Sequence, residues 1–492
     1  MSSDYPLPPN PEEAISTRPL GPPPEDVPEV QPVCRRGQPL VAWVVILSIV
    51  TLIVGMGMVR DPGEKVGASR QGAQSRIADV EARYIVGANE FARRSGQDMY
   101  EQAKEMARGS AAKRLRFVVV AGELRGPEEA LHLLNSEDWT ELPADQAALP
   151  GLLRWLYESY AAGDYSGDVL DAKERATVER EMGWLGQLAL HPEDGPDEAA
   201  RAAVMTSARR TFWGMIVLVV GMLGVGLAGL VGLFLFVVFI RAGQVRSGLG
   251  APGVNGGLYA ETFALWLTLF VLQGLLAAFL PVPPPVRYLV TAAGSLATLV
   301  ALGWPVLRGV PWRQVLQEVG LQRPERPWRE VLLGPVCYAA TIPLLGVGIA
   351  LTLLLMQIQS YLSGGDAPAP VHPISEVLAK SRWWDLLQLL FLVSFVAPVV
   401  EETMFRGVLY RHLRDGTARL RPIASMLLSA TVVSFIFAVI HPQGLAAVPA
   451  LMSLAYGFNA AREWRGSLLP CMIAHGLNNG IVFTLSILML SD

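Results

Sequence analysis

The chain has 492 residues, of which 51% are hydrophobic and 17% are charged, and its mean hydropathy is +0.35. This much apolar sequence exceeds what one soluble core can bury, so the composition excludes an ordinary soluble protein and predicts a polytopic membrane protein. The formal net charge of -4 is small for this length and gives no reason to expect a nucleic-acid partner.

The first 59 residues divide into a polar tail and an apolar run. Residues 1–39 contain eleven prolines and few apolar residues, a composition typical of a disordered tail. Residues 40–59 form an apolar run about as long as one bilayer crossing requires. Because a long polar tail comes first and no small-residue cleavage site stands out, we expect an uncleaved transmembrane signal anchor.

Residues 60–210 are charged and alanine-rich, with helical periodicity in several stretches. The sequence Gly126-Pro127-Glu128-Glu129 is typical of a helix start, because proline is tolerated in the first turn and acids favour the helix N-terminus. These features predict a soluble helical domain inserted between membrane helices. Helical hairpins of this kind suit protein binding, so we expect this domain to bind a protein partner.

Eight further apolar stretches follow and bring the total to about nine crossings. We assign 211–330 to additional transmembrane helices with a basic loop, and 331–492 to a C-terminal core. Gly224, Ala228 and Gly232 lie at four-residue steps and predict a face on which another helix packs closely. The approximate spans are 211–240, 259–280, 288–307, 331–357, 384–405, 422–441, 444–461 and 468–490.

Lysine and arginine gather in alternate loops, most densely in 308–329 and 411–421. Basic loops mark the cytoplasmic side of a membrane protein. With nine crossings, this bias places the N-terminus in the cytoplasm and the 60–210 domain, together with the C-terminus, outside. If 444–461 is only a re-entrant segment, the C-terminus lies inside instead.

Two adjacent carboxylates, Glu401 and Glu402, follow the apolar run 386–400. An ionised side chain at the centre of a spanning helix costs about 2.5–3.5 kcal/mol, so acids there need partners, a wet cavity or protonation, and are functional candidates. Residues four apart share a helix face, so we expect Glu402 to pair with Arg406, whereas Glu401 points about 100° away without a local cation. Pro398 removes a helical donor just upstream, which predicts a kink or a loosened turn at the acids.

Two of the six histidines lie in the last apolar stretches. His441 ends one predicted crossing, and His475 lies about seven residues into the final one. Asn479 follows His475 by four residues, so both share one helix face. The spans place His441 near the far end of its crossing and His475 near the cytoplasmic side, a difference in depth of about 10 Å or more.

These side chains suit the hydrolysis of an amide bond. A carboxylate without a charge partner can act as general base on a water, with a histidine to position that water. An imidazole and an asparagine amide can then donate to the oxyanion of a tetrahedral intermediate. A metal is an alternative, because Glu401, His441 and His475 would suffice as three ligands of an open zinc site. The sequence lacks the H-E-x-x-H, G-x-S-G and G-x-G-D motifs of other intramembrane hydrolases.

Three motifs in this order resemble the CPBP intramembrane protease family, which includes the CAAX prenyl endopeptidases and Abi-like bacterial membrane proteins. They are E-E-x-x-x-R at Glu401, Glu402 and Arg406, F-x-x-x-H at Phe437 and His441, and H-x-x-x-N at His475 and Asn479. The resemblance covers roughly residues 330–490. It implies that Glu401 activates the water with His441, that His475 and Asn479 form the oxyanion site, and that Glu402 and Arg406 hold the helix.

The resemblance therefore implies an all-α intramembrane endopeptidase, glutamate-dependent or metal-dependent, with zinc as the candidate metal. Its expected substrates are peptides or lipidated proteins among membrane lipids, and its expected location is a bacterial cytoplasmic membrane, which it crosses several times. Two alternatives remain. One is a non-catalytic membrane scaffold or signalling adaptor with the 60–210 domain as its binding module. The other is a proton-coupled transporter that uses Glu401 and Glu402 as a relay.

Overall fold

The structure is a computed structural model that describes most of the chain. Its regular elements are helices, and no strand occurs in the described part of the chain, which confirms the predicted all-α fold. The predicted disordered tail lies outside the described residues except for its last three positions. The described residues are 37–59, 64–166, 168–243, 247–250, 253, 255–363 and 382–490.

The first membrane helix, α1 (Pro39–Val59), packs along α10 (Gly256–Phe279). Both helices begin at the same end of the bundle, where Gly37 lies against the backbone of Gly257. The indole Nε1 of Trp43 in α1 donates a hydrogen bond to a histidine of the C-terminal core, His412 Nε2, at 3.0 Å. The predicted signal anchor is therefore a packed part of the bundle.

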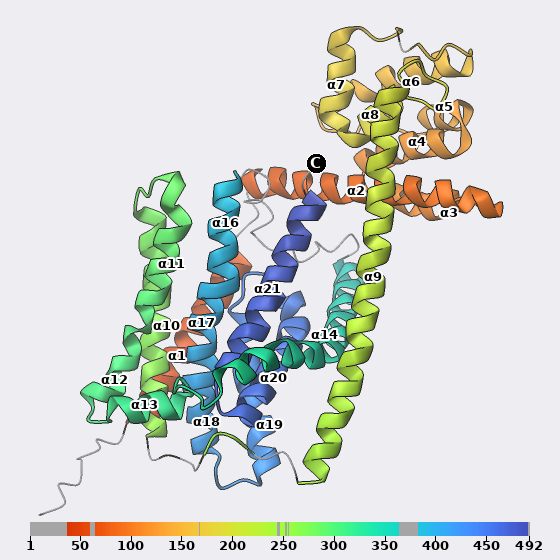
Figure 1. Ribbon diagram of the computed structural model, residues 1–492. Coiled ribbons are helices and arrows are strands. Elements are labelled where there is room, and N and C mark those ends of the chain that lie inside the picture. The colour runs from red at the N-terminus through yellow and green to blue at the C-terminus, as the bar shows by residue number, and fades with distance from the viewer. Residues whose placement is uncertain are drawn as a thin grey trace, which may run out of the picture.

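The helices of the predicted soluble domain lie at the opposite end of the bundle (Figure 1). It has a hydrophobic core of its own, which includes Leu115, Leu134, Leu153 and Leu185. Its longest helix, α2, runs across the end of the bundle and contacts the C-terminal helix. The helices are α2 (Glu64–Ala92), α3 (Tyr100–Ala103), α4 (Ala111–Arg125), α5 (Pro127–Ser136), α6 (Leu149–Ala161), α7 (Ala172–Met182) and α8 (Trp184–Leu190).

One helix, α9 (Glu198–Arg241), joins the soluble helices to the bundle without a break. The predicted boundary at residue 210 therefore falls inside a helix. α9 packs on α14 (Pro327–Ser363) through Gly229, where a side chain would clash with the carbonyl oxygen of Ala339. The predicted packing face was wrong, because within the described residues no atom lies within 4 Å of where a Cβ of Gly224 or Gly232 would be.

Seven helices in the described residues are long and apolar enough to cross a membrane. They correspond to the first seven predicted crossings. The last two, 444–461 and 468–490, correspond to α20 (Val448–Arg465) and α21 (Leu469–Leu490), which are not among the seven, so a total of nine stays a prediction. The remaining helices are α11 (Arg287–Ala297), α12 (Gly303–Leu307), α13 (Trp312–Val319), α16 (Trp383–Phe391), α17 (Ala397–Glu402), α18 (Tyr410–Gly416) and α19 (Pro422–Val439).

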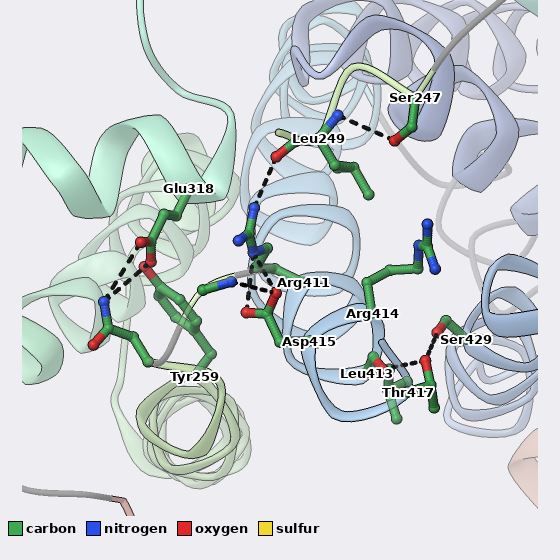
Figure 2. Close-up of polar contacts among 12 residues, drawn as sticks. Ser247, Leu249, Tyr259, Glu318, Arg411, Leu413, Arg414, Asp415, Thr417 and Ser429 are labelled. Atoms are coloured by element: carbon green, nitrogen blue, oxygen red, sulfur yellow. Dashed lines mark hydrogen bonds and ion pairs between the residues drawn. The ribbon is translucent and has the colours of Figure 1, made fainter. Parts of the chain in front are cut away.

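The basic loops meet at the end of the bundle that lies away from the soluble helices. Figure 2 shows this polar network, in which Arg411 pairs with Asp415 and donates to the carbonyl oxygen of Leu249 at 2.8 Å. In the same network, the hydroxyl of Tyr259 donates to Glu318. Loops that are far apart in the sequence thus form one surface, and the prediction that this surface is cytoplasmic stays open to test.

Candidate active site

The two adjacent acids lie in a continuous helical rod that contains two π-helical turns. The rod runs from Trp383 to Gly416, and the π-helical turns, Leu392–Val396 and Thr403–Leu409, lie on either side of α17. In both turns an N–H group bonds to the carbonyl five residues back: Ala397 to Leu392, and Tyr410 to Phe405. The disturbance expected from Pro398 therefore takes the form of widened turns, a feature that is frequent at functional sites.

Neighbouring helices supply side chains that bond to carbonyl groups in these widened turns. Arg462 of α20 donates through Nε to the carbonyl oxygen of Arg406 at 3.2 Å. Asn479 of α21 donates through Nδ2 to the carbonyl oxygen of Val393 at 2.8 Å. The turns around the acids are therefore fixed from outside by two polar side chains, because a buried carbonyl needs a donor.

Glu402 forms a buried ion pair with Arg406. Its Oε1 atom lies 3.0 Å from an Arg406 guanidinium nitrogen, and neither side chain is exposed. The ring of Phe437 lies 4.5 Å from the guanidinium carbon, and Phe458 lies 5.3 Å from it. The same Oε1 atom also lies 2.8 Å from Nδ1 of His475. Both partners contact the Oε1 atom of Glu402, while its buried Oε2 atom has no hydrogen-bond partner among the described residues.

Glu401 faces the two histidines. Its Oε2 atom lies 3.9 Å from Nε2 of His441 and 3.9 Å from Nε2 of His475. The Glu401 side chain is 21% exposed, and its Oε2 atom makes no hydrogen bond within the described residues. One carboxylate oxygen is therefore left facing two ring nitrogens.

The two imidazoles meet although the predicted spans put them at different depths. The ring of Phe458 in α20 stacks on His475 at 5.2 Å, and the next residue of α20 bonds to Ser434 in the middle of α19. His475 therefore lies beside the middle of α19. His441, at the end of that helix, turns its ring back over Phe437, with the ring centroids 4.2 Å apart. Helical side chains point toward the helix N-terminus, so this direction is the natural one.

Hydrogen bonding on the far side of each imidazole fixes which nitrogen faces Glu401. Nδ1 of His475 lies against the Glu402 carboxylate, and Nδ1 of His441 bonds to the carbonyl oxygen of Phe437. Both neighbours are acceptors, so each Nδ1 carries the proton in a neutral ring. In that state both Nε2 atoms present lone pairs toward Glu401.

Asn479 lies one helical turn beyond His475 on the same face of α21. Its side chain bonds to Val393, and the described residues include no hydrogen bond between it and Glu401 or either histidine. The amide of Asn478 donates to Oδ1 of Asn479 at 3.1 Å, which fixes the orientation of that side chain. Only one of the two Nδ2 protons is used by Val393, so the other can serve a ligand.

The three predicted metal ligands have suitable chemistry but unsuitable spacing. Zinc-bound histidines commonly donate their other ring N–H to a carboxylate or a carbonyl, as His475 and His441 do here. However, two ligands 3.9 Å apart would enclose an angle of about 144° at zinc, for bonds of about 2.05 Å, whereas tetrahedral sites need about 109°. The described residues hold no group of three histidine, cysteine, aspartate or glutamate side chains that fits a metal ion. This arrangement therefore does not fit zinc.

Two residues at the site were missed from the sequence. Arg462 was counted only as a loop charge, yet it is buried and donates to the carbonyl oxygens of Arg406, Glu318 and Gly466. Phe458 stacks on His475 and lies four residues before Arg462. Their four-residue spacing places both on one face of α20, which is compatible with a shared site. Many helices carry such a pair, so this spacing alone does not identify them as site residues.

Comparisons with known proteins agree with the sequence motifs. The family model for type II CAAX prenyl endopeptidase Rce1-like proteins matches residues 383–481, which include every site residue described above. The membrane-embedded CAAX protease MroQ of Staphylococcus aureus (strain USA300) is 27% identical over 151 residues. That alignment covers 30% of this chain and 59% of the relative's length. No solved structure matches the chain.

Proposed function

Because residues 383–481 carry a domain of the CPBP intramembrane protease family, we propose that this protein is an intramembrane endopeptidase in which Glu401 activates a water. The proposed substrates are membrane-associated or lipidated proteins, and the proposed location is a bacterial cytoplasmic membrane. One observation carries the proposal. Glu402 is neutralised by Arg406, while the neighbouring Glu401 has a carboxylate oxygen 3.9 Å from two imidazole nitrogens.

The spacing between Glu401 and the imidazoles suits a bridging water. A water that lies about 2.8 Å from both Glu401 Oε2 and one Nε2, themselves 3.9 Å apart, subtends an angle of about 90° between them. An angle of about 90° between two hydrogen-bond partners is acceptable to a water molecule. A zinc ion between the same two atoms would need an angle of about 144°, far from its tetrahedral preference of about 109°. Glu401 and His441 both present acceptors, so together they can take the two protons of the water and leave its oxygen lone pairs free for the substrate.

The reaction then follows from general base catalysis. The water oxygen bonds to the scissile carbonyl carbon as one water proton moves to Glu401. The resulting tetrahedral intermediate collapses as its C–N bond breaks, and Glu401 returns the proton to the leaving amine. The products are a carboxylic acid and an amine, and transfer of the acid proton to the amine gives a carboxylate and an ammonium ion, so atoms and charges balance.

The oxyanion of that intermediate needs donors, and His475 and Asn479 can provide them. His475 donates from Nε2 when it is protonated on both nitrogens, and the Glu402 carboxylate against its Nδ1 atom stabilises this cation. Asn479 offers its second amide proton. Glu402 would thus act through His475 as a positioning residue as well as pairing with Arg406.

The test measures cleavage in proteoliposomes with a panel of internally quenched peptides, with and without a lipid chain. We expect the wild-type protein to cleave at least one lipidated peptide, and Glu401→Gln to lower the rate by about 1,000-fold while thermal unfolding is unchanged. Equal rates in the two proteins would refute the role of Glu401. Failure of the wild-type protein to cleave any peptide would favour the scaffold alternative, and proton-coupled uptake without cleavage would favour the transporter.

A further inference from the structure

The soluble helices enclose a cavity far from the bundle. Its volume is about 390 Å³, which lies within the range of about 300–1,000 Å³ that is usual for ligand pockets. It lies where α4 ends and α5 begins, and α6 and the segment after α8 complete its wall. Nothing in the proposed proteolytic mechanism uses it.

The cavity wall contains a tyrosine that is nearly buried but whose hydroxyl oxygen reaches the cavity. Tyr157 is 5% exposed, and its hydroxyl makes no hydrogen bond within the described residues. By contrast, the hydroxyl of the neighbouring Tyr160 donates to the carbonyl oxygen of Ala189 at 3.0 Å. Burial raises the pKa of Tyr157, so its hydroxyl stays protonated and can donate. Because this hydroxyl reaches the cavity and has no protein acceptor among the described residues, it can donate to a ligand that occupies the cavity.

The fit between Tyr157 and Gly122 keeps this hydroxyl in place. A Cβ atom at residue 122 would lie 2.9 Å from the ring atom Cε1 of Tyr157 and 3.0 Å from its hydroxyl oxygen. Those distances are shorter than carbon atoms tolerate, so only glycine allows the tyrosine to occupy this position. The stacked ring of Tyr165, whose centroid lies 5.4 Å from that of Tyr160, extends the aromatic wall.

Charges of both signs surround the cavity. Arg93 and Glu193 face each other at 3.8 Å and are both exposed, and Arg125 lies on the same rim. Glu123, which also lines the wall, is already paired with Arg201 at 2.6 Å. The rim therefore has no excess of cations that would select a phosphate or another anion.

We propose that this cavity binds a short extended peptide segment of a protein partner, with a backbone carbonyl of the peptide accepting the Tyr157 hydroxyl proton. A peptide offers acceptors and donors in alternation and can carry side chains of both signs, which matches the mixed rim. Tyrosines are also frequent at protein-binding surfaces, because they supply a rigid apolar face and a polar tip. This proposal does not depend on the proteolytic function.

The test uses the full-length protein in nanodiscs. A pool of random fluorescein-labelled hexapeptides is selected against the wild-type protein, and the affinity of each enriched peptide is measured by fluorescence anisotropy. Gly122→Ala should weaken binding by at least about tenfold, because the added methyl group displaces Tyr157. Gly151→Ala is the matched control in α6, because no atom of the described residues lies within 4 Å of where its Cβ would be, and it should leave the affinity within about twofold.

Tyr157→Phe keeps the test valid if Gly122→Ala does not fold. It removes only the hydroxyl and should weaken binding by about five- to tenfold, the loss expected for one hydrogen bond. Glu401→Gln should bind peptides as the wild-type protein does, so a failure of the proteolytic proposal would not affect this result. Enrichment of no peptide over empty nanodiscs, or equal affinity for Tyr157→Phe and wild type, would overturn the proposal. Displacement of every enriched peptide by inorganic phosphate would also overturn the peptide proposal and would assign the cavity to an anion instead.

Discussion

Replacing Glu402 with alanine should destabilise the protein far more than replacing its neighbour. Glu402 and Arg406 are both fully buried, and Glu402 also accepts from Nδ1 of His475. Glu402→Ala therefore leaves a buried guanidinium without its counter-charge, a change that costs about 3–5 kcal/mol. The lost contact with the imidazole adds about 1 kcal/mol. For a chain of this length, an unfolding entropy of about 2.1 cal/mol/K per residue gives about 1 °C per kcal/mol, so the melting temperature should fall by about 4–6 °C.

The assay is thermal unfolding in detergent, followed by intrinsic tryptophan fluorescence. Glu401→Ala is the matched control, because this carboxylate is 21% exposed and its Oε2 atom has no hydrogen bond to lose. We expect that variant to change stability by less than about 1 kcal/mol. A double variant, Glu402→Leu with Arg406→Met, should recover more than half of the loss, because it removes the unpaired charge. Equal melting temperatures for Glu401→Ala and Glu402→Ala would refute the reasoning.

Three further predictions concern the imidazoles, the metal alternative and the packing of α21. His441→Ala should lower kcat by about 100-fold, because His441 Nε2 lies 3.9 Å from Glu401 Oε2, whereas His132→Ala on the exposed face of α5 should leave kcat unchanged. The chelator 1,10-phenanthroline should change the cleavage rate by less than about twofold; inhibition that added zinc reverses would instead assign a metal to Glu401. Gly476→Ala should lower the melting temperature, since its methyl group would clash with the carbonyl oxygen of Ser394, while Gly224→Ala, which has open space, should not.

The fold class and the main helices could be predicted because they depend on composition and hydropathy alone. The helix faces that pack against one another could not be predicted in this way. The membrane part of α9 is apolar on every side, and only 6% of its most apolar 18-residue stretch is buried. The hydrophobic periodicity of the sequence therefore does not show which face meets a neighbouring helix. The regular steps at Gly224, Ala228 and Gly232 suggested one face, yet Gly229, on another, makes the close contact with α14.

The pairing of Glu402 with Arg406 follows from helix geometry, because residues four apart are neighbours whatever the tertiary structure. The contacts between helices depend on details that sequence spacing does not contain. Asn479 was expected in the oxyanion site through its spacing from His475, and the structure adds a bond to Val393 in a π-helical turn. A π-helical turn changes the register of carbonyl groups by one residue, so contacts that depend on it cannot be counted along an ideal helix.

His475 gives a physical reason for two acids in adjacent positions. Its Nδ1 atom contacts Glu402, and its Nε2 atom faces Glu401, so one ring spans both carboxylates. Adjacent helical side chains diverge by about 100°, which lets the two carboxylates reach opposite edges of the same imidazole. An acid in place of Thr403 would instead lie three residues from Arg406 and compete with Glu402 for it. Adjacency therefore separates the acid that pairs with Arg406 from the acid that faces the two imidazoles, while a single histidine connects them.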